Sequence, residues 1–231
     1  HITKVLRMKE GEEIIITDGK GSFYKAALSL VTNKHCSIQL LSKESARPLW
    51  KNKLEIAVAP TKHLDRMEWF VEKATEIGVD QINFVACEFS ERKQIKIERM
   101  NRIAISAMKQ SHKAILPQIP EMMTFNAFIN RPFEGKRYIA HCYNMKNICD
   151  ADSSPTSAST STQSSVFLGQ LLKGEESAQV LIGPEGDFSM REVEAAMAAG
   201  FIPVSLGNSR LRTETAALVA VHLMNLANST Q

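Results

Sequence analysis

The segment VLIGPEGDFSMREVEAAMAAG, residues 180–200, constrains the fold of this chain more than any other. Three apolar residues run directly into Gly-Pro and then into Glu-Gly-Asp, which carry too much glycine and carboxylate for a core. A helix start follows, because Ser189 and Glu192 have the spacing of a capping box, and Gly200 stands where that helix would end. The segment predicts a buried strand, a loop whose backbone can cradle a ligand, and a helix.

Buried strands and amphipathic helices alternate along most of the chain. Compact apolar stretches, typical of buried parallel strands, are LEIAVAP, QINFVAC, RYIAHCY and FIPVSL, which begin at residues 54, 81, 137 and 201. Apolar residues spaced as on one helix face follow the first two, between residues 67 and 77 and between residues 100 and 108. This alternation predicts an α/β fold with a mostly parallel sheet and helices on its faces.

The N-terminal part consists of short predicted strands joined by turns. Asp18-Gly19 lies between two apolar runs, which is a good hairpin signal, and CSIQLL, from residue 36, is a further predicted strand. The character changes at Trp50, so we predict a small β-barrel or sheet domain over residues 1–49 and a second domain over residues 50–231. Within the second domain, the Ser- and Thr-rich residues 150–165 predict a flexible surface loop.

Charge and cysteine content limit the class of protein only loosely. The formal net charge of +3 is a mild excess that suits a polyanionic partner without requiring one. The cysteines are scattered with no C-x-x-C pair, which favours reduced thiols and a cytoplasmic protein. No apolar run reaches the ~18 residues of a membrane span and no signal peptide is evident. We therefore expect no contact with a membrane. His63, His112 and His222 lack metal-ligand spacing, so we also expect no bound metal.

The last predicted helix, TETAALVAVHLMNLAN from residue 213, is apolar around nearly its whole circumference. A helix of this kind is buried on all sides. At a chain terminus such burial favours packing against a partner, so we expect a homodimer formed through this helix. The alternative is a monomer in which the helix is sunk in its own core.

Two loops each follow a predicted strand and precede a helix, GPEGD from residue 183 and LGNSRLR from residue 206. In open α/β sheets ligands bind at the carboxyl ends of strands, so two neighbouring loops would form one pocket. The phosphate-binding and dinucleotide-binding glycine motifs are absent. Glu185 and Asp187 would repel a phosphate but suit a cation or a neutral ligand, such as the sulfonium of S-adenosylmethionine. The alternative is that GPEG is only a tight connection.

IGPEGDFSMREVEAAMAAGF followed by LGNSRLRTETAALVA resembles the signature of the bacterial 16S ribosomal RNA (uracil-N3)-methyltransferase family of the SPOUT superfamily. HITKVLRMKEG at the start and VEKATEIGV in the middle are also similar to its sequences, so the resemblance spans almost the whole chain. It implies a small PUA-like β-barrel followed by a parallel sheet tied in a trefoil knot. It also implies S-adenosylmethionine as cofactor, homodimers, and ribosomal RNA or the small ribosomal subunit as partner.

The resemblance carries over cofactor-binding residues position by position. The two loops and their flanks supply Ile182, Gly183, Pro184, Glu185, Gly186, Leu206, Gly207, Leu211, Arg212, Thr215 and Ala216, and the end of the third strand supplies His141. Some positions depart from the family pattern. Asp187 stands where a second glycine is common, Ser209 where an arginine is common, and Lys113 where many relatives have arginine.

Methyl transfer to uracil N3 requires loss of the N3 proton, so the site needs a base or cations that stabilise the uracil anion. We expect Arg212 to stabilise negative charge on the uracil carbonyls, and Glu185 or Glu214 to help remove the proton. Two plainer interpretations stay open. Glu214 has the position of a first-turn residue favoured by the helix dipole, and Arg212 has the character of a surface charge.

RNA contact should be electrostatic first. The basic candidates are Lys4, Arg7, Lys9, Lys20 and Lys25 in the N-terminal part and Arg99, Arg102, Lys109 and Lys113 in and after the second predicted helix. The alternative for both groups is a solvated basic face.

The resemblance therefore implies an S-adenosylmethionine-dependent enzyme that methylates N3 of a specific uridine in 16S ribosomal RNA. One alternative is a SPOUT methyltransferase that acts on another RNA position, such as a ribose 2′-hydroxyl or a guanine. Another is an RNA-binding adaptor without catalysis, which the changes at Asp187 and Ser209 would signal.

Overall fold

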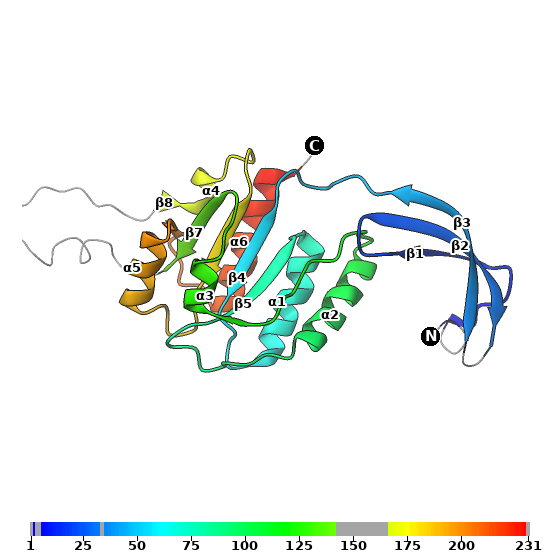
Figure 1. Ribbon diagram of the computed structural model, residues 1–231, viewed down its shortest axis with the longest axis horizontal. Coiled ribbons are helices and arrows are strands. Elements are labelled where there is room, and N and C mark those ends of the chain that lie inside the picture. Colours follow the sequence, from blue (N-terminus) through cyan, green and yellow to red (C-terminus); the bar gives the residue numbers. More distant parts are fainter. Residues whose placement is uncertain (1, 3–5, 33–34, 142–165, 230–231) are drawn as a thin grey trace, which may run out of the picture. The chain divides into compact units, whose positions relative to one another are not determined.

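A computed structural model describes residues 2, 6–32, 35–141 and 166–229 of the protein (Figure 1). The chain divides into two compact units, residues 1–48 with 108–116 and residues 49–107 with 117–231. The loop predicted over residues 150–165 lies outside the described residues. So do Lys4 and residues 142–143, which are the end of the predicted third strand.

An antiparallel sheet forms the first unit. Its strands are β1 (Glu13–Thr17), β2 (Ser22–Val31) and β3 (Cys36–Ser45), paired in that order. Asp18 shapes the turn between β1 and β2, because its Oδ1 accepts hydrogen bonds from the amides of Lys20 at 2.7 Å and Ser22 at 3.1 Å. The hairpin predicted at Asp18-Gly19 is confirmed, and a small sheet lies where a small β-barrel or sheet is predicted.

A parallel sheet forms the second unit. Its strands are β4 (Leu54–Val58), β5 (Gln81–Ala86), β6 (Met123–Thr124), β7 (Lys136–Ala140), β8 (Val166–Phe167), β9 (Ala178–Ile182) and β10 (Ile202–Ser205). Among the described residues these seven strands have the order β6-β5-β4-β9-β7-β10-β8. β4 and β9 are buried at every position, as expected for central parallel strands covered on both faces. The predicted α/β architecture is therefore confirmed.

Six helices accompany this sheet among the described residues. They are α1 (Leu64–Ile77), α2 (Ile97–Gln110), α3 (Phe125–Ile129), α4 (Leu168–Leu171), α5 (Met190–Ala198) and α6 (Thr213–Asn228). α3 and α5 begin at side-chain caps, Thr124 and Ser189. The capping box predicted for α5 is present, since Ser189 Oγ accepts from Glu192 N at 3.3 Å and Glu192 Oε2 accepts from Ser189 N at 2.9 Å. In the part of the chain that the structure describes, every helix is too short or too polar to cross a membrane.

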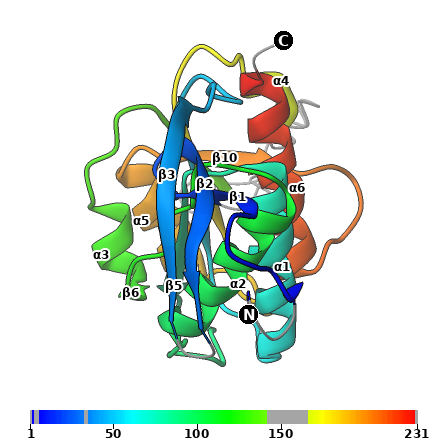
Figure 2. The same ribbon diagram turned by 90° about the vertical axis from the view of Figure 1, so that its right-hand side faces the viewer.

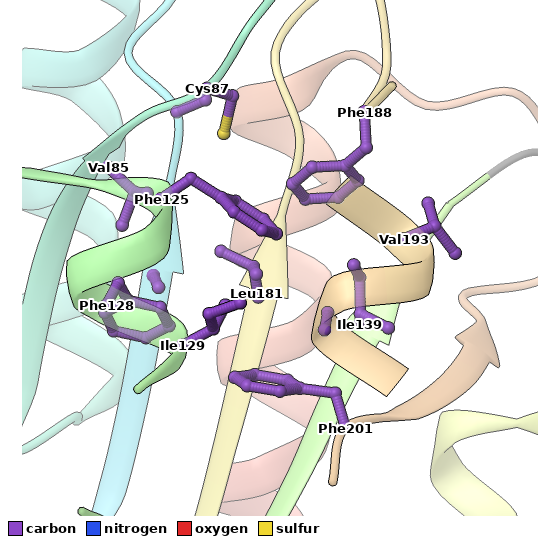
Figure 3. Packing of buried hydrophobic residues seen from close by; sticks show 13 residues of the cluster. Val85, Cys87, Phe125, Phe128, Ile129, Ile139, Leu181, Phe188, Val193 and Phe201 are labelled. Atoms are coloured by element: carbon purple, nitrogen blue, oxygen red, sulfur yellow. The ribbon is translucent and has the colours of Figure 1, made fainter. Parts of the chain in front are cut away.

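α3 and α5 cover one face of the sheet with an aromatic core (Figure 3). The rings of Phe125 and Phe188 lie 5.9 Å apart between centroids, and those of Phe128 and Phe201 lie 6.3 Å apart. Leu181 of β9 is fully buried among them. In the same view α6 passes behind the strands, so β9 is enclosed between helices on both sides.

α1 and α6 lie side by side within the second unit (Figure 2). The buried side chains of α6 fall on one face, which includes Ala217, Ala220, Val221 and Met224, whereas Leu226 is 63% exposed. The chain's own core therefore covers only part of the apolar circumference predicted for this helix.

Candidate functional site

Three neighbouring strands end at one edge of the parallel sheet. β9, β7 and β10 are adjacent and parallel, so the loops that follow Ile182 and Ser205 lie close to His141 at the end of β7. These segments, together with Arg66 of α1, surround a cavity of about 970 Å³. A hollow of this size at strand ends is typical of small-molecule and cofactor sites.

Most of the residues expected to bind the cofactor line this cavity. They are His141, Ile182, Gly183, Pro184, Glu185, Gly186, Leu206, Gly207, Leu211, Arg212 and Ala216. The two predicted loops therefore converge on one hollow. Thr215 and Glu214 are not among its lining residues, and both lie in the first turn of α6. Sequence reasoning missed Arg66, which lines the cavity from the first turn of α1.

The first loop is a tight turn that leaves little room for added atoms. Asp187 N donates to Pro184 O at 3.0 Å. A Cβ on Gly183 would lie 3.0 Å from ring atoms of Phe188, which is fully buried. Asp187 has φ +66°, in the left-handed region that glycine adopts most readily. This backbone conformation gives a physical reason for the glycine that the family resemblance leads us to expect at that position.

Glu185 is tied to segments far from it in sequence. Its Oε2 accepts a hydrogen bond from Lys62 N at 3.1 Å, in the segment between β4 and α1. Its Oε1 lies 3.4 Å from Nη1 of Arg66. The same guanidinium places its Nε 3.7 Å from Oε1 of Glu214. The loop after β9 and the first turn of α6 thus share one cationic partner.

Comparison with known proteins identifies the family. A family model of the RNA methyltransferase domain matches residues 48–225, and one of the RNA methyltransferase PUA domain matches residues 1–41. This chain belongs to the RNA methyltransferase family. The predictions of a methyltransferase and of an N-terminal PUA-like part are confirmed by these two matches.

Individual relatives agree with this assignment to the RNA methyltransferases. A crystal structure of a "probable rRNA-methyltransferase" from Porphyromonas gingivalis is 42% identical, with a TM-score of 0.85 over 99% of this chain and 90% of that one. A ribosomal RNA small subunit methyltransferase E from Neisseria gonorrhoeae, bound to S-adenosyl methionine, is 26% identical, with a TM-score of 0.80 over 97% of this chain and 86% of that one.

A curated relative extends the comparison. A ribosomal RNA small subunit methyltransferase E from Synechocystis sp. is 29% identical over 230 residues, which are 97% of this chain and 69% of that protein. The likeness of the whole chain to solved methyltransferases confirms the SPOUT-type fold class, and the trefoil knot implied by the resemblance is consistent with it.

The second loop of this RNA methyltransferase is more open than the first. Residues 207–210 are exposed, and a Cβ added to Gly207 would meet no atom within 4 Å. Arg212, also exposed, is the N-cap residue of α6, and no side chain caps the helix there. The first backbone N–H groups of a helix lack intrahelical partners. The start of α6 therefore adds hydrogen-bond donors beside the cavity that Thr213 helps to line.

His141 lines the cavity from the end of β7 and is 8% exposed. Burial lowers the pKa of its imidazole below the ordinary value of 6.5, and the carboxylate of Asp187 partly opposes this shift. The ring is consequently neutral at neutral pH. A neutral ring adds no positive charge to a cavity whose first loop carries two carboxylates.

The residues predicted to bind RNA belong to both units. Arg99 and Arg102 lie in the second unit, whereas Lys109, Lys113, Arg7 and Lys9 belong to the first. Arg99 is paired with Glu68 at 2.6 Å, which offsets part of its charge. Across the described ranges, no group of three or more His, Cys, Asp or Glu side chains is placed to hold a metal ion.

Proposed function

We propose that this protein uses S-adenosylmethionine to methylate N3 of a uridine in small-subunit ribosomal RNA. The observation that carries the proposal is the convergence of the Gly183 and Gly207 loops on one cavity of about 970 Å³ at the strand ends. The names of the relatives from N. gonorrhoeae and Synechocystis support the choice of RNA. The methyl donor bound to the former supports the choice of cofactor.

The cavity suits a methyl donor with a positively charged sulfur. When bound, S-adenosylmethionine supplies an electrophilic methyl group. Backbone amides of the two glycine-bearing loops and of the α6 N-terminus can hold the polar parts of such a ligand. The carboxylate of Glu185, which lines the cavity, can attract its sulfonium. We assign cofactor binding to the predicted residues that line the cavity. We also assign it to Thr215, which does not line the cavity but is next in sequence to the lining residue Ala216.

The protein's part in the reaction is to prepare the uracil for in-line attack. A uracil N3 holds its proton at neutral pH, so that proton must pass to a base as the new N–C bond forms. Arg212, exposed at the rim, stabilises the negative charge that develops on the uracil carbonyls. Glu214 and Glu185 are the candidate proton acceptors. Glu214 has one buried oxygen, Oε2, without a hydrogen-bond partner among the described residues.

The two sequence regions divide the work in this proposal. Residues 1–49, most of which match the PUA family, bind RNA with the help of basic side chains such as Arg7 and Lys9. Residues 50–231 carry out the transfer in the cytoplasm, where ribosomal RNA is found. Two copies associate through α6, whose Leu226 is left 63% exposed by the single chain. A monomer in sedimentation experiments at micromolar concentration would contradict this last part.

The decisive experiment maps the methylated base. Small ribosomal subunits from a strain that lacks this gene are incubated with the protein and S-adenosylmethionine, and the RNA is analysed by mass spectrometry. We expect one 3-methyluridine. A methyl group on a ribose or a guanine would replace the proposal by the first alternative, and absence of cofactor binding in calorimetry would favour the adaptor.

Arg212→Ala tests the catalytic assignment. Loss of a charge-stabilising donor should slow single-turnover methylation by about 100-fold or more, while the fold is kept because Arg212 is exposed. Arg191→Ala is the matched control, since it removes an exposed arginine of the same unit that does not line the cavity. A near-normal rate for Arg212→Ala would remove this residue from the mechanism.

A further inference from the structure

The geometry points to Arg66 as a positioning residue that holds the two cofactor-side loops in their relative places. This inference rests on the proposed function, because it assigns the loops to the methyl donor. Arg66 stands in the first turn of α1, and its side chain is 29% exposed. It is the α1 residue that lines the cavity. It therefore reaches the site from an element that contains none of the predicted cofactor residues.

Two different nitrogens of Arg66 engage two different carboxylates. Nη1 lies 3.4 Å from Oε1 of Glu185, and Nε lies 3.7 Å from Oε1 of Glu214. Glu185 belongs to the loop after β9, and Glu214 follows the loop after β10. A planar guanidinium can hold two partners in fixed relative directions, which a single ammonium cannot do. Arg66 thus joins the two loop regions through one rigid group.

Burial gives this contact more weight than a surface ion pair. Glu214 is only 7% exposed, and a buried carboxylate is costly without a compensating charge. Arg66 is the cation paired with it among the described residues. Glu185 is further fixed by the amide of Lys62, at 3.1 Å. The segment between β4 and α1 and the first turn of α1 consequently hold the first loop at two points.

The consequence is that cofactor binding and proton removal depend on the same side chain. Movement of Arg66 would remove one of the two contacts that hold Glu185 and would leave the charge of Glu214 buried without its partner. Both losses act through residues that Arg66 contacts, so it is not assigned a direct role on the reacting atoms.

The test uses the full chain with Arg66→Gln, Arg66→Lys, Glu185→Gln and the double variant Arg66→Gln/Glu185→Gln. Cofactor affinity is measured by calorimetry without RNA, and single-turnover methylation is measured at saturating S-adenosylmethionine. Lys73→Gln is the matched control, because Lys73 lies on the same helix and also pairs with two carboxylates, Glu72 at 2.7 Å and Glu76 at 2.9 Å.

We expect Arg66→Gln to weaken cofactor binding about tenfold and to slow the single-turnover rate as well. Arg66→Lys should recover part of the affinity, because it keeps the charge but cannot hold both carboxylates. In the Glu185→Gln background, Arg66→Gln should weaken binding by a clearly smaller factor than it does alone. Lys73→Gln should change affinity by less than about twofold.

Wild-type affinity and rate in Arg66→Gln would overturn the inference, as would factors that simply multiply in the double variant. If Arg66→Gln does not fold, Arg66→Lys decides, and wild-type behaviour of that variant overturns the assignment. A wild-type protein that binds the cofactor but methylates no uridine would refute the proposed substrate alone. The calorimetric comparison of the Arg66 variants would still stand.

Discussion

A buried glutamate lies near each end of the parallel strands, and the two differ in how many of their carboxylate oxygens are paired. Near the start of β4, Glu55 is 1% exposed, yet both of its carboxylate oxygens are paired. Its Oε1 lies 2.5 Å from Lys53 Nζ, and its Oε2 contacts Arg131 and accepts from Gln179 Nε2 at 2.8 Å. At the opposite, carboxyl end, Glu214 contacts Arg66 through one oxygen, while its buried Oε2 has no hydrogen-bond partner among the described residues.

This difference is the one expected between a charge that serves the fold and a proton acceptor, which is the role proposed for Glu214. A buried polar group that serves only the fold is normally satisfied, because an unmade hydrogen bond costs free energy. The carboxylate of Glu55 meets that rule through both of its oxygens. Its partner Gln179 in turn accepts from Arg137 Nε at 3.2 Å, and the Arg137 guanidinium lies 4.0 Å from the Phe201 ring centroid. At the carboxyl end, the buried Oε2 of Glu214 has no such partner among the described residues, and Glu214 is next in sequence to Thr213, which lines the cavity. This is the arrangement expected of the proton acceptor in the proposed function.

Removing Glu55, which pairs with Lys53, Arg131 and Gln179, should have the largest effect on stability. Glu55→Ala leaves the charges of Lys53 and Arg131 without their shared partner and should lower the free energy of unfolding by about 3–5 kcal/mol. Urea denaturation measures this change. Glu13→Ala, which removes an exposed partner of Lys25, should cost about 1 kcal/mol or less. Equal losses of unfolding free energy in the two variants would show that the buried Glu55 contacts stabilise the fold no more than an exposed ion pair does.

Crowding the cavity end should have a smaller effect on stability and a clear effect on the cofactor. Gly183→Ala places a Cβ 3.0 Å from the buried Phe188 ring and should cost about 1–3 kcal/mol through overpacking. Because the ring must move, we also expect weaker binding of S-adenosylmethionine. Thermal unfolding and calorimetry measure the two effects.

Gly186→Ala is the control for this prediction, since its Cβ would lie 3.4 Å from Phe89 Cβ, an ordinary contact. Its stability should change by about 1 kcal/mol or less. Equal behaviour of the two glycine variants would mean that the Gly183 contact with Phe188 does not shape the loop.

Burial of His141 should give the free energy of unfolding a modest dependence on pH. The folded pKa of His141 is below 6.5, so as the pH falls past 6.5 the unfolded imidazole binds its proton first and the folded state loses stability. His141→Gln lacks this proton uptake. Its unfolding free energy, measured from pH 7.5 to 5, should therefore fall less than that of the wild type. Parallel curves for the two proteins would contradict the buried neutral ring.

Replacing Asp187 should have the smallest effect. Asp187→Gly relieves the left-handed backbone at φ +66° but loses the bond from Phe188 N to Asp187 Oδ1, at 2.8 Å, and adds freedom to the unfolded chain. These contributions oppose one another, so the unfolding free energy should change by about 1 kcal/mol or less and the cofactor affinity should stay within about threefold. A tenfold change in affinity would show that the Asp187 side chain takes part in binding.

Local patterns predicted much of the cavity end. The capping box of Ser189 and Glu192, the glycines of the two loops and the apolar strands before them all lie within short segments, so spacing alone located them. The family resemblance added the residue assignments, and eleven of those twelve cofactor residues line the cavity, with Thr215 outside it. Residues 108–116, in contrast, join the first unit by tertiary contacts, such as Leu116 N to Gly19 O at 2.9 Å, that no local pattern indicates.

Arg66 shows why the remainder could not be predicted. Its carboxylate partner Glu185 lies 119 positions away, and nothing in the spacing of α1 distinguishes Arg66 from a surface charge. The available signal was its place in the first turn of a helix after a strand, where ligands of α/β proteins gather. The order of the strands in the sheet brings the first turn of α1 next to the loops after β9 and β10, and the spacing of residues in the sequence does not indicate that order.

Sequence alone sufficed for the strand–loop–helix segments and the chemistry of their glycines and carboxylates, because these depend on neighbours along the chain. The tertiary structure alone decided which charges meet. The order β4-β9-β7-β10 brings Glu55 to Gln179 at one end of the strands and Arg66 to Glu185 and Glu214 at the other. Charged side chains act over a few ångströms, so their partners are set by the packing of the sheet and not by distance in sequence.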